Sequence, residues 1–245
     1  MDRIRCVAIV SCAVFSACGR IGFDPPSSGG DTNDAGADAG ADADTECNIA
    51  VRGSVCSGGA IVAGSWGGRD YMVTPSGCTD GTTPTCDGST DTLTKTWFGT
   101  GGMFTNIPGV ENRLGSAPAS QLGDVNTEVA ATHTSVTADS AVRYCYDLDY
   151  GGYTDWYLPA SSELIEVLLC HSNATLNPIY PSENPGCVTG GRSMELTGFA
   201  LATYWSSTET DSGGTAAMRL NFSIGVHGDN FKDRIELVRC IRYGP

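Results

Sequence analysis

The sequence has little positive charge. Its 245 residues include 14 Lys and Arg against 28 Asp and Glu, a formal net charge of −14, and only 17% of residues are charged. Because phosphate binding needs a basic face, this balance argues against a nucleic-acid partner. The chain also lacks a G-X-Y period, a heptad array and any run of about 18 apolar residues. It is therefore not a collagen-like, coiled-coil or polytopic membrane protein.

Catalytic motifs are scarce as well. There are three histidines, His133, His171 and His227, and none lies in an H-E-x-x-H, G-x-S-x-G or C-x-x-C context. Neighbouring carboxylates are frequent, but closeness in sequence does not establish a general acid and base. We therefore expect a protein that is not an enzyme and has neither catalytic residues nor a required cofactor.

The first 17 residues have the pattern of a secretory signal. Two arginines lie within residues 1–5, and residues 6–17 form an apolar run that is too short to span a bilayer as a helix. The sequence Phe15-Ser16-Ala17-Cys18 resembles the bacterial lipobox, which is cleaved before a cysteine that then receives lipid. The alternative is ordinary cleavage near Ala17, which would leave Cys18 as a free thiol.

The number of cysteines favours lipidation. Of 11 cysteines, eight remain once residues 1–17 are removed and Cys18 carries lipid. An even number in an exported domain predicts four disulfides. Several acyl chains on one residue anchor a protein stably to a membrane. Because Gly19 rather than an aspartate follows the cysteine, we expect the outer membrane. The eight cysteines are Cys47, Cys56, Cys78, Cys86, Cys145, Cys170, Cys187 and Cys240.

Residues 18–46 are expected to be a lipidated cysteine followed by a disordered acidic linker. Positions 19–46 hold seven acids and one arginine, with a Pro-Pro pair and an Asp-Ala-Gly repeat that cannot form a core. The folded domain is then 47–245, which is long enough for one core.

Three cysteine pairs are close enough in sequence to predict bridges within the domain. We expect local disulfides at Cys47–Cys56 and Cys78–Cys86, the second around a loop rich in turn residues. We also expect Cys170 and Cys187 to join the ends of a polar, proline-containing segment at 171–198.

Two helices are predicted in the second half. Thr137 is a candidate cap for a helix through about Leu148, stopped by Gly151 and Gly152. Ser161 is a candidate cap for a second helix. Its apolar stripe would consist of Leu164, Val167 and Leu168.

The predicted strands lie within 60–73, at 204–206, and over 216–224 and 235–243. In 216–224, alternation places Met218, Leu220, Phe222 and Ile224 inward and Arg219, Asn221 and Ser223 outward. Gly225 and Gly228 suit a hairpin turn. Two helices and an antiparallel meander make an α+β domain.

Three blocks occur in a characteristic order. They are Gly151-Gly152-Tyr153-Thr154-Asp155-Trp156-Tyr157-Leu158-Pro159 with Glu163-Leu164, then Tyr204-Trp205-Ser206-Ser207-Thr208-Glu209, then Val238-Arg239-Cys240-Ile241-Arg242. Together they resemble the family of the C-terminal domain of the Legionella collagen-like protein, over roughly residues 90–245. The motif positions are Gly152, Trp156, Leu158, Pro159, Glu163, Leu164, Tyr204, Trp205, Ser206, Ser207, Arg239 and Arg242.

The resemblance implies a fold and several contacts. The family is distantly similar to C-type-lectin-like domains, in which the first helix is bridged to the final strand, and this implies a Cys145–Cys240 disulfide. We expect Trp156 and Trp205 to be core aromatics whose indole N–H groups find buried partners. We also expect Arg239 and Arg242 to pair with Glu163 or Glu209.

The resemblance also suggests ligands. A calcium-dependent sugar site would draw oxygen ligands from Glu183, Asn184, Asp229 and Asn230, although the order of these residues differs from that of lectins. A polyanion site, as in the name-giving adhesin, would need a basic patch such as Lys232 with Arg234 and Arg219. The 47–245 region has a net charge of −9, with Lys95 and Lys232 as its two lysines. This charge favours a neutral glycan or a protein partner.

The expected protein is therefore a lipid-anchored outer-membrane protein that displays one disulfide-stapled, C-type-lectin-like recognition domain. Its expected partners are the membrane, through the anchor, and a glycan or a surface protein in adhesion. The alternatives are a structural envelope lipoprotein without a small ligand and an enzyme related to the sulfatase-modifying proteins of this fold.

Overall fold

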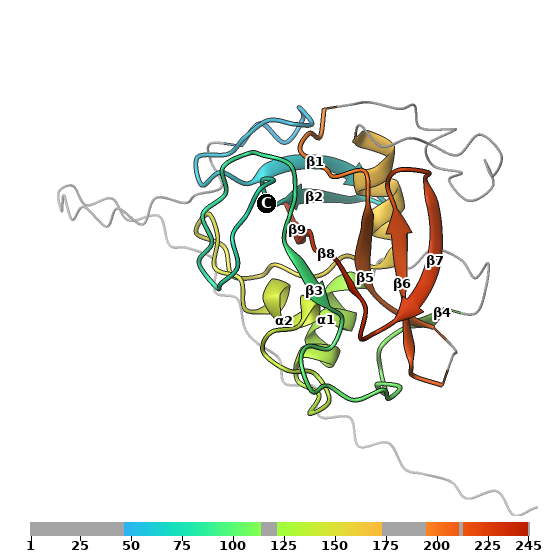
Figure 1. The fold of residues 1–245 in the computed structure, drawn as a ribbon. Coiled ribbons are helices and arrows are strands. Elements are labelled where there is room, and N and C mark those ends of the chain that lie inside the picture. Colours follow the sequence, from blue (N-terminus) through green and yellow to red (C-terminus); the bar gives the residue numbers. More distant parts are fainter. Residues whose placement is uncertain (1–46, 114–121, 173–194, 211–212, 245) are drawn as a thin grey trace, which may run out of the picture. The chain divides into compact units, whose positions relative to one another are not determined.

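The computed structural model describes residues 47–113, 122–172, 195–210 and 213–244 (Figure 1). The predicted signal, Cys18 and the acidic linker lie outside these residues, and so do Glu183, Asn184 and Cys187. No helix within the described ranges is long and apolar enough to cross a bilayer. The described part contains helices and two sheets, so the predicted α+β class is confirmed.

The smaller sheet has three antiparallel strands in the order β1-β2-β9. Strands β1 (Ile61–Trp66) and β2 (Arg69–Val73) form a hairpin in the region where short strands were predicted. Strand β9 (Ile241–Tyr243) pairs with β2, so that Arg242 lies opposite Met72. The end of the chain is thereby paired to the beginning of the domain.

The larger sheet has six strands in the order β3-β8-β5-β6-β7, with β4 paired to β5. Its strands are β3 (Thr94–Thr96), β4 (Asn112–Arg113), β5 (Thr203–Thr210), β6 (Ala216–Asn221), β7 (Val226–Phe231) and β8 (Ile235–Leu237). Strand β5 runs parallel to β4 and β8. The sheet is therefore mixed and not wholly antiparallel as predicted. All residues of β5 are buried, as expected for a central strand covered on both faces.

The single strand predicted over 235–243 is wrong, because the segment is divided between the two sheets. Strand β8 belongs to the larger sheet and β9 to the smaller one. Between them, Arg239 forms a buried ion pair with Asp91 and Cys240 is bonded to Cys145. These two side-chain contacts hold the connecting residues 238–240 away from strand pairing.

The hairpin after 216 turns earlier than predicted. Met218, Leu220 and Phe222 are buried as expected, but Ile224 is 49% exposed. The chain leaves β6 at Asn221 and turns at Gly225, whose φ of +66° favours glycine. Gly228 lies inside β7, so its predicted turn role is wrong.

Helix α1 (Gly123–Ala131) was not predicted, and α2 (Ala141–Tyr146) is shorter than predicted. The α1 sequence buries small and polar side chains, so it has no apolar stripe to reveal it. In α2 the cap is Ser140, whose Oγ accepts the Arg143 N–H at 2.9 Å. Thr137 instead donates its hydroxyl to Asp139 at 2.6 Å.

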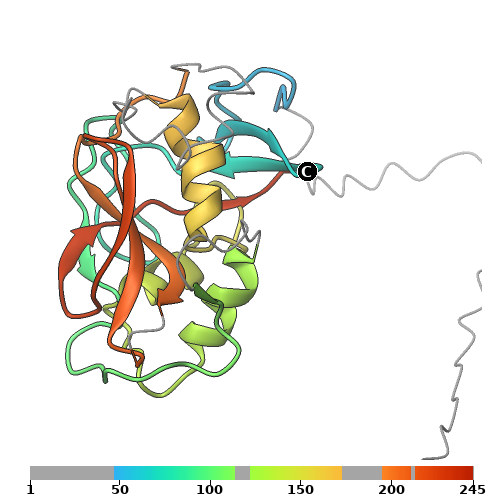
Figure 2. The same ribbon diagram turned by 90° about the vertical axis from the view of Figure 1, so that its right-hand side faces the viewer.

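The second predicted helix is confirmed as one helical segment with changing pitch. It comprises α3 (Ser161–Glu163), a π-helical turn (Leu164–Leu168) and a 3-10 turn (Leu169–His171). Its apolar stripe of Leu164, Val167 and Leu168 is buried as expected. The segment packs against β1 of one sheet and against β5 and β6 of the other (Figure 2). Its cap is Ala160 and not Ser161.

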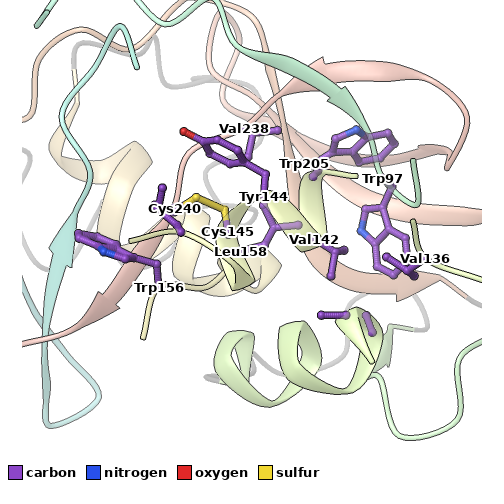
Figure 3. Close-up of a cluster of buried hydrophobic side chains, with 14 of the residues drawn as sticks. Trp97, Val136, Val142, Tyr144, Cys145, Trp156, Leu158, Trp205, Val238 and Cys240 are labelled. Atoms are coloured by element: carbon purple, nitrogen blue, oxygen red, sulfur yellow. A yellow bond between two sulfur atoms is a disulfide. The ribbon is translucent and has the colours of Figure 1, made fainter. Parts of the chain in front are cut away.

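A core of aromatic side chains surrounds the Cys145–Cys240 disulfide (Figure 3). Trp156 and Trp205 are buried in it, and each indole N–H donates to a backbone carbonyl, of Tyr150 at 3.1 Å and of Lys95 at 3.0 Å. Their predicted core roles are confirmed. Trp97 is a third buried indole, and it donates to the Ser206 carbonyl at 2.8 Å.

Three of the predicted disulfides are present. They are Cys47–Cys56, Cys78–Cys86 and the long-range Cys145–Cys240 bridge that the resemblance implied. Cys170 is also disulfide-bonded, while Cys187, its predicted partner, lies outside the described residues.

Candidate functional site

A cleft of about 390 Å³ lies between helices α1 and α2 and residues 154–157, which belong to the first of the three sequence blocks. Its carboxylates are Asp124, Glu128 and Asp155, and its aromatic walls are Tyr146, Trp156 and Tyr157, with Thr127 and Thr154 completing the lining. Helix α1 supplies three of these residues, the end of α2 one, and residues 154–157 the remainder. This volume lies in the range of small-molecule sites, roughly 300–1,000 Å³.

Helix α1 presents its carboxylates to the cleft because of its spacing and its docking. Asp124 and Glu128 are four residues apart and therefore lie on one face, with Thr127 beside them. The buried Thr127 hydroxyl donates to the Leu158 carbonyl at 3.1 Å and accepts the Leu158 N–H at 3.0 Å. These two bonds fix α1 against the family block.

Residues 154–157 form the wall opposite α1, and backbone pairing and aromatic packing hold them in place. Tyr157 exchanges backbone hydrogen bonds with Ile241 of β9, at 2.8 and 3.0 Å. Trp156 packs edge-on against Tyr150 and Tyr153. The wall is therefore preformed by the fold, whereas Tyr146, 37% exposed, lies at the rim.

The three carboxylates have different partners. Asp155 accepts a two-pronged ion pair from Arg242, at 2.7 and 3.2 Å, and the Arg242 guanidinium lies 3.8 Å from the Tyr153 ring centroid. The Oδ1 atom of Asp124 is buried and has no hydrogen-bond partner among the described residues. Glu128 is exposed. The cleft therefore combines the partly exposed ring of Tyr146 with acceptor oxygens.

The predicted pairing of the motif arginines is wrong. Arg242 pairs with Asp155, and Arg239 pairs with the buried Asp91 at 2.7 Å. Glu209 instead pairs with the buried Lys232 and accepts the Ile107 N–H at 3.0 Å. Arg239 follows β8 and Arg242 lies in β9. At these two positions the nearest carboxylates are those of Asp91 and Asp155, and not those of Glu163 or Glu209.

Glu163 lies beneath the cleft and is fully buried. It accepts the Ala160 N–H at 2.8 Å and the Tyr157 hydroxyl at 3.3 Å. Burial raises the pKa of Glu163 to about 8, and the negative charge of Asp124 adds to the shift. Gly123 at the start of α1 packs so closely on this carboxylate that a β-carbon would overlap it. Glu163 thus supports the end of α1 that lines the cleft.

Replacing Glu163 with glutamine is expected to make the stability of the domain less dependent on pH. The folded state keeps the carboxyl protonated up to about pH 8, while the unfolded chain releases the proton near 4.5. Between these values the unfolded state binds fewer protons, so stability falls as pH rises. The slope removed by Glu163→Gln is up to about 1.4 kcal/mol per pH unit.

Urea unfolding at several pH values from 5 to 9 measures this effect. Near pH 5 the variant should approach the wild type, because the glutamine amide oxygen can still accept the Ala160 N–H. Parallel loss of stability in the two proteins toward high pH would contradict the prediction.

The structure describes only two of the four predicted calcium ligands. Asp229 and Asn230 lie in β7, where Asn230 donates to Glu236 at 2.9 Å and the Asp229 carbonyl accepts from Arg219 at 3.2 Å. Over the described ranges, no group of three or more His, Cys, Asp or Glu side chains could hold a metal ion. Glu183 and Asn184 lie outside those ranges, so the full predicted set stays a prediction.

The predicted basic patch of Lys232, Arg234 and Arg219 is wrong. Lys232 points inward, where its ammonium donates to the Thr105 carbonyl at 2.8 Å and lies 4.5 Å from the Trp97 ring centroid. Arg219 is paired with Glu236 at 2.8 Å, and only Arg234 of the three is exposed. Lys95, the other lysine, is also buried and pairs with Asp80.

The histidines are not brought together. His133 exchanges a 2.7 Å hydrogen bond with Ser135, and His227 lines a separate shallow pocket at β6 and β7. Burial lowers the pKa of His171 to about 4. None of the three lines the cleft between α1, α2 and residues 154–157.

Comparison with known protein families gives a match over the second half of the chain. The profile of the Lcl C-terminal domain matches residues 117–242, which include both helices of the cleft and all three sequence blocks. No curated protein and no solved structure matches the chain. Asp124, Glu128 and Tyr146 were missed from the sequence because each lies in a helix whose pattern does not mark a ligand site.

Proposed function

Since the chain belongs to the Lcl C-terminal domain family, we propose that it is a non-catalytic recognition protein of the outer membrane, held there by lipid on Cys18. Its folded domain is C-type-lectin-like and binds carbohydrate in the cleft between α1, α2 and residues 154–157. Its role is adhesion. The acidic linker at 18–46 holds the domain clear of the membrane surface.

The proposed lectin-like fold is supported by the position of the long-range disulfide. Cys145 on α2 is bonded to Cys240, which immediately precedes β9. A bridge from a helix to the last strand is what the resemblance implied, although α2 is the second helix of the described residues. The pairing of β9 with β2 brings the two ends of the domain together, as a looped lectin-like domain requires.

The observation that carries the binding proposal is the lining of the cleft. Sugar rings have an apolar C–H face and a rim of hydroxyl groups. Tyr146, 37% exposed, offers a flat apolar surface at the rim of the cleft, and the exposed carboxylates of Glu128 and Asp155 accept hydrogen bonds from hydroxyl groups. The walls are fixed by backbone and hydroxyl hydrogen bonds, which reduces the entropy cost of binding.

The non-catalytic part of the proposal is supported by the state of the cysteines. The seven cysteines that the structure describes are all disulfide-bonded, so none offers the reactive thiol that a sulfatase-modifying enzyme uses.

The direct test is binding of the detergent-solubilised full chain, with its disulfides formed, to a broad glycan array. Binding that survives chelation is expected, because the cleft does not depend on a metal ion for its aromatic walls. Binding lost on chelation would move the site to the region of Glu183 and Asn184. No binding to any glycan would overturn the carbohydrate proposal and favour a structural role.

Truncation of Tyr146 to alanine is expected to weaken glycan binding about tenfold, the equivalent of ~1.4 kcal/mol, because a stacking surface at the rim is lost. The ring is partly exposed, so the domain should still fold. Phe231→Ala is the matched control, since Phe231 is 53% exposed and does not line the cleft. Equal binding by both variants would place the ligand elsewhere.

Replacement of Cys18 by serine is expected to abolish lipid attachment. Cells expressing the wild-type chain should incorporate labelled palmitate into it, and the Cys18→Ser variant should not. Label retained by the variant would show that Cys18 is not the acceptor.

A further inference from the structure

Lys232 and Glu209 form an ion pair inside the domain, away from the cleft. The ammonium group contacts the carboxylate directly, and the side chains of Lys232 and Glu209 are 1% and 0% exposed. Lys232 immediately follows β7, and Glu209 lies in the central strand β5, at a sequence separation of 23. Keeping two opposite charges away from water is costly, so a reaction that removes both charges is favoured at this place.

The surroundings favour the neutral forms of both groups. Burial raises the pKa of the Glu209 carboxyl and lowers the pKa of the Lys232 ammonium. A proton that passes from the ammonium to the carboxylate leaves a free amine beside a carboxylic acid. The free amine is a nucleophile, and the carbon of a protonated carboxyl group is open to attack in a way that the carbon of a carboxylate is not.

Further contacts orient the two reacting groups. The Lys232 Nζ atom donates to the Thr105 carbonyl at 2.8 Å and lies 4.5 Å from the Trp97 ring centroid. The Ile107 N–H donates to the Glu209 Oε2 atom at 3.0 Å, while Oε1 is the oxygen that contacts the lysine. The Ile107 N–H is therefore placed to stabilise negative charge that develops on Oε2. Because the fold holds the amine against the carboxyl group, the reaction needs no encounter between separate molecules.

We propose that Lys232 and Glu209 react with each other to form an isopeptide bond, with no other enzyme involved. The Nζ lone pair attacks the Cδ atom of Glu209, and the Ile107 N–H holds the oxyanion on Oε2. The Oε1 atom, which carries the proton first received from the ammonium, takes a second proton from the nitrogen. The Cδ–Oε1 bond then breaks, water leaves, and an Nζ–Cδ amide remains with no change of oxidation state. The product ties β5 to the turn after β7 by a bond that reducing agents do not cut.

Peptide mass spectrometry of the detergent-solubilised full chain tests the proposal after complete reduction, alkylation and digestion with trypsin. An acylated Lys232 resists trypsin, so segment 193–219 should be recovered joined to segment 220–234. The mass of the joined species should be about 18 Da below the sum of the two peptides, which is the mass of one water. Without the bond, 193–219 and 220–232 appear as separate peptides. Neither segment contains a cysteine, so a residual disulfide cannot imitate the link.

The matched control variant is Lys232→Arg, because a guanidinium keeps the positive charge but stays protonated and is not a nucleophile. It should yield 193–219 unlinked. Lys95 is a control within the wild-type chain, since its partner Asp80 is 66% exposed, and trypsin should cut after Lys95 as usual. Recovery of the wild-type segment 193–219 in the unlinked form alone would overturn the inference, whether or not the variant folds. Equal loss of water at Lys95 and Lys232 would also overturn it, because the reaction would then not depend on burial.

Discussion

Replacing Asp91 with asparagine is expected to destabilise the domain by about 3–5 kcal/mol, because it leaves the buried guanidinium of Arg239 without its counter-charge. The Arg239 Nη1 atom lies 2.7 and 2.8 Å from the two carboxylate oxygens of Asp91. Tyr204 donates its hydroxyl to the same carboxylate at 2.9 Å. Both members of the ion pair are almost fully buried. Denaturant unfolding measures the loss.

Two further variants make this test specific. Asp147→Asn breaks the half-exposed pair with Arg143 on α2 and should cost no more than about 0.5 kcal/mol. The double variant Asp91→Leu with Arg239→Met removes both charges and should be more stable than Asp91→Asn alone, because no unpaired charge is left inside. A cost for Asp91→Asn no larger than that of Asp147→Asn would show that the pair is not essential.

Removal of the Cys145–Cys240 bridge, by alanine at both positions, is expected to cost about 4–5 kcal/mol in the chain-entropy account of disulfides. The bridge closes a loop with a sequence separation of 95 residues and lies in the middle of the aromatic core. The matched comparison is the double alanine variant of Cys78 and Cys86, whose separation of 8 gives a cost of about 2.5 kcal/mol.

Unfolding of both double variants under non-reducing conditions gives the comparison. The long-range variant should have the lower midpoint by a clear margin. Equal losses, or a larger loss for the short loop, would contradict the loop-length argument and point to packing around the sulfur atoms as the main contribution.

The fold could be predicted where the sequence carries its own periodicity. The stripe of Leu164, Val167 and Leu168 predicts the buried helix, and alternation through Met218 and Leu220 predicts β6. The prediction from sequence failed where contacts with distant residues override the local pattern. Residues 235–243 read as one strand, but Asp91 and Cys145, distant in sequence, divide it.

The candidate site was not predicted from the sequence. Trp156 and Tyr157 belong to a recognisable block, but the sequence indicated a core role for Trp156 and no ligand site beside it. Helix α1 was not predicted either, since its contacts depend on the Thr127 hydroxyl and on the close approach of Gly123 to Glu163, which no local pattern encodes. Lys232 shows the converse, because an apparent surface cation is a buried partner of Glu209.

The division of residues 235–243 between the two sheets has a consequence for the order of folding. Strand β9 pairs with β2 from the far end of the domain, and Cys240 is bonded to Cys145, so neither contact can form until residues 240–243 have been synthesised. The short-loop cysteine pairs, by contrast, join residues that are made almost together. The domain therefore completes its fold late, and its slowest contacts are expected to be those that span the longest stretch of sequence.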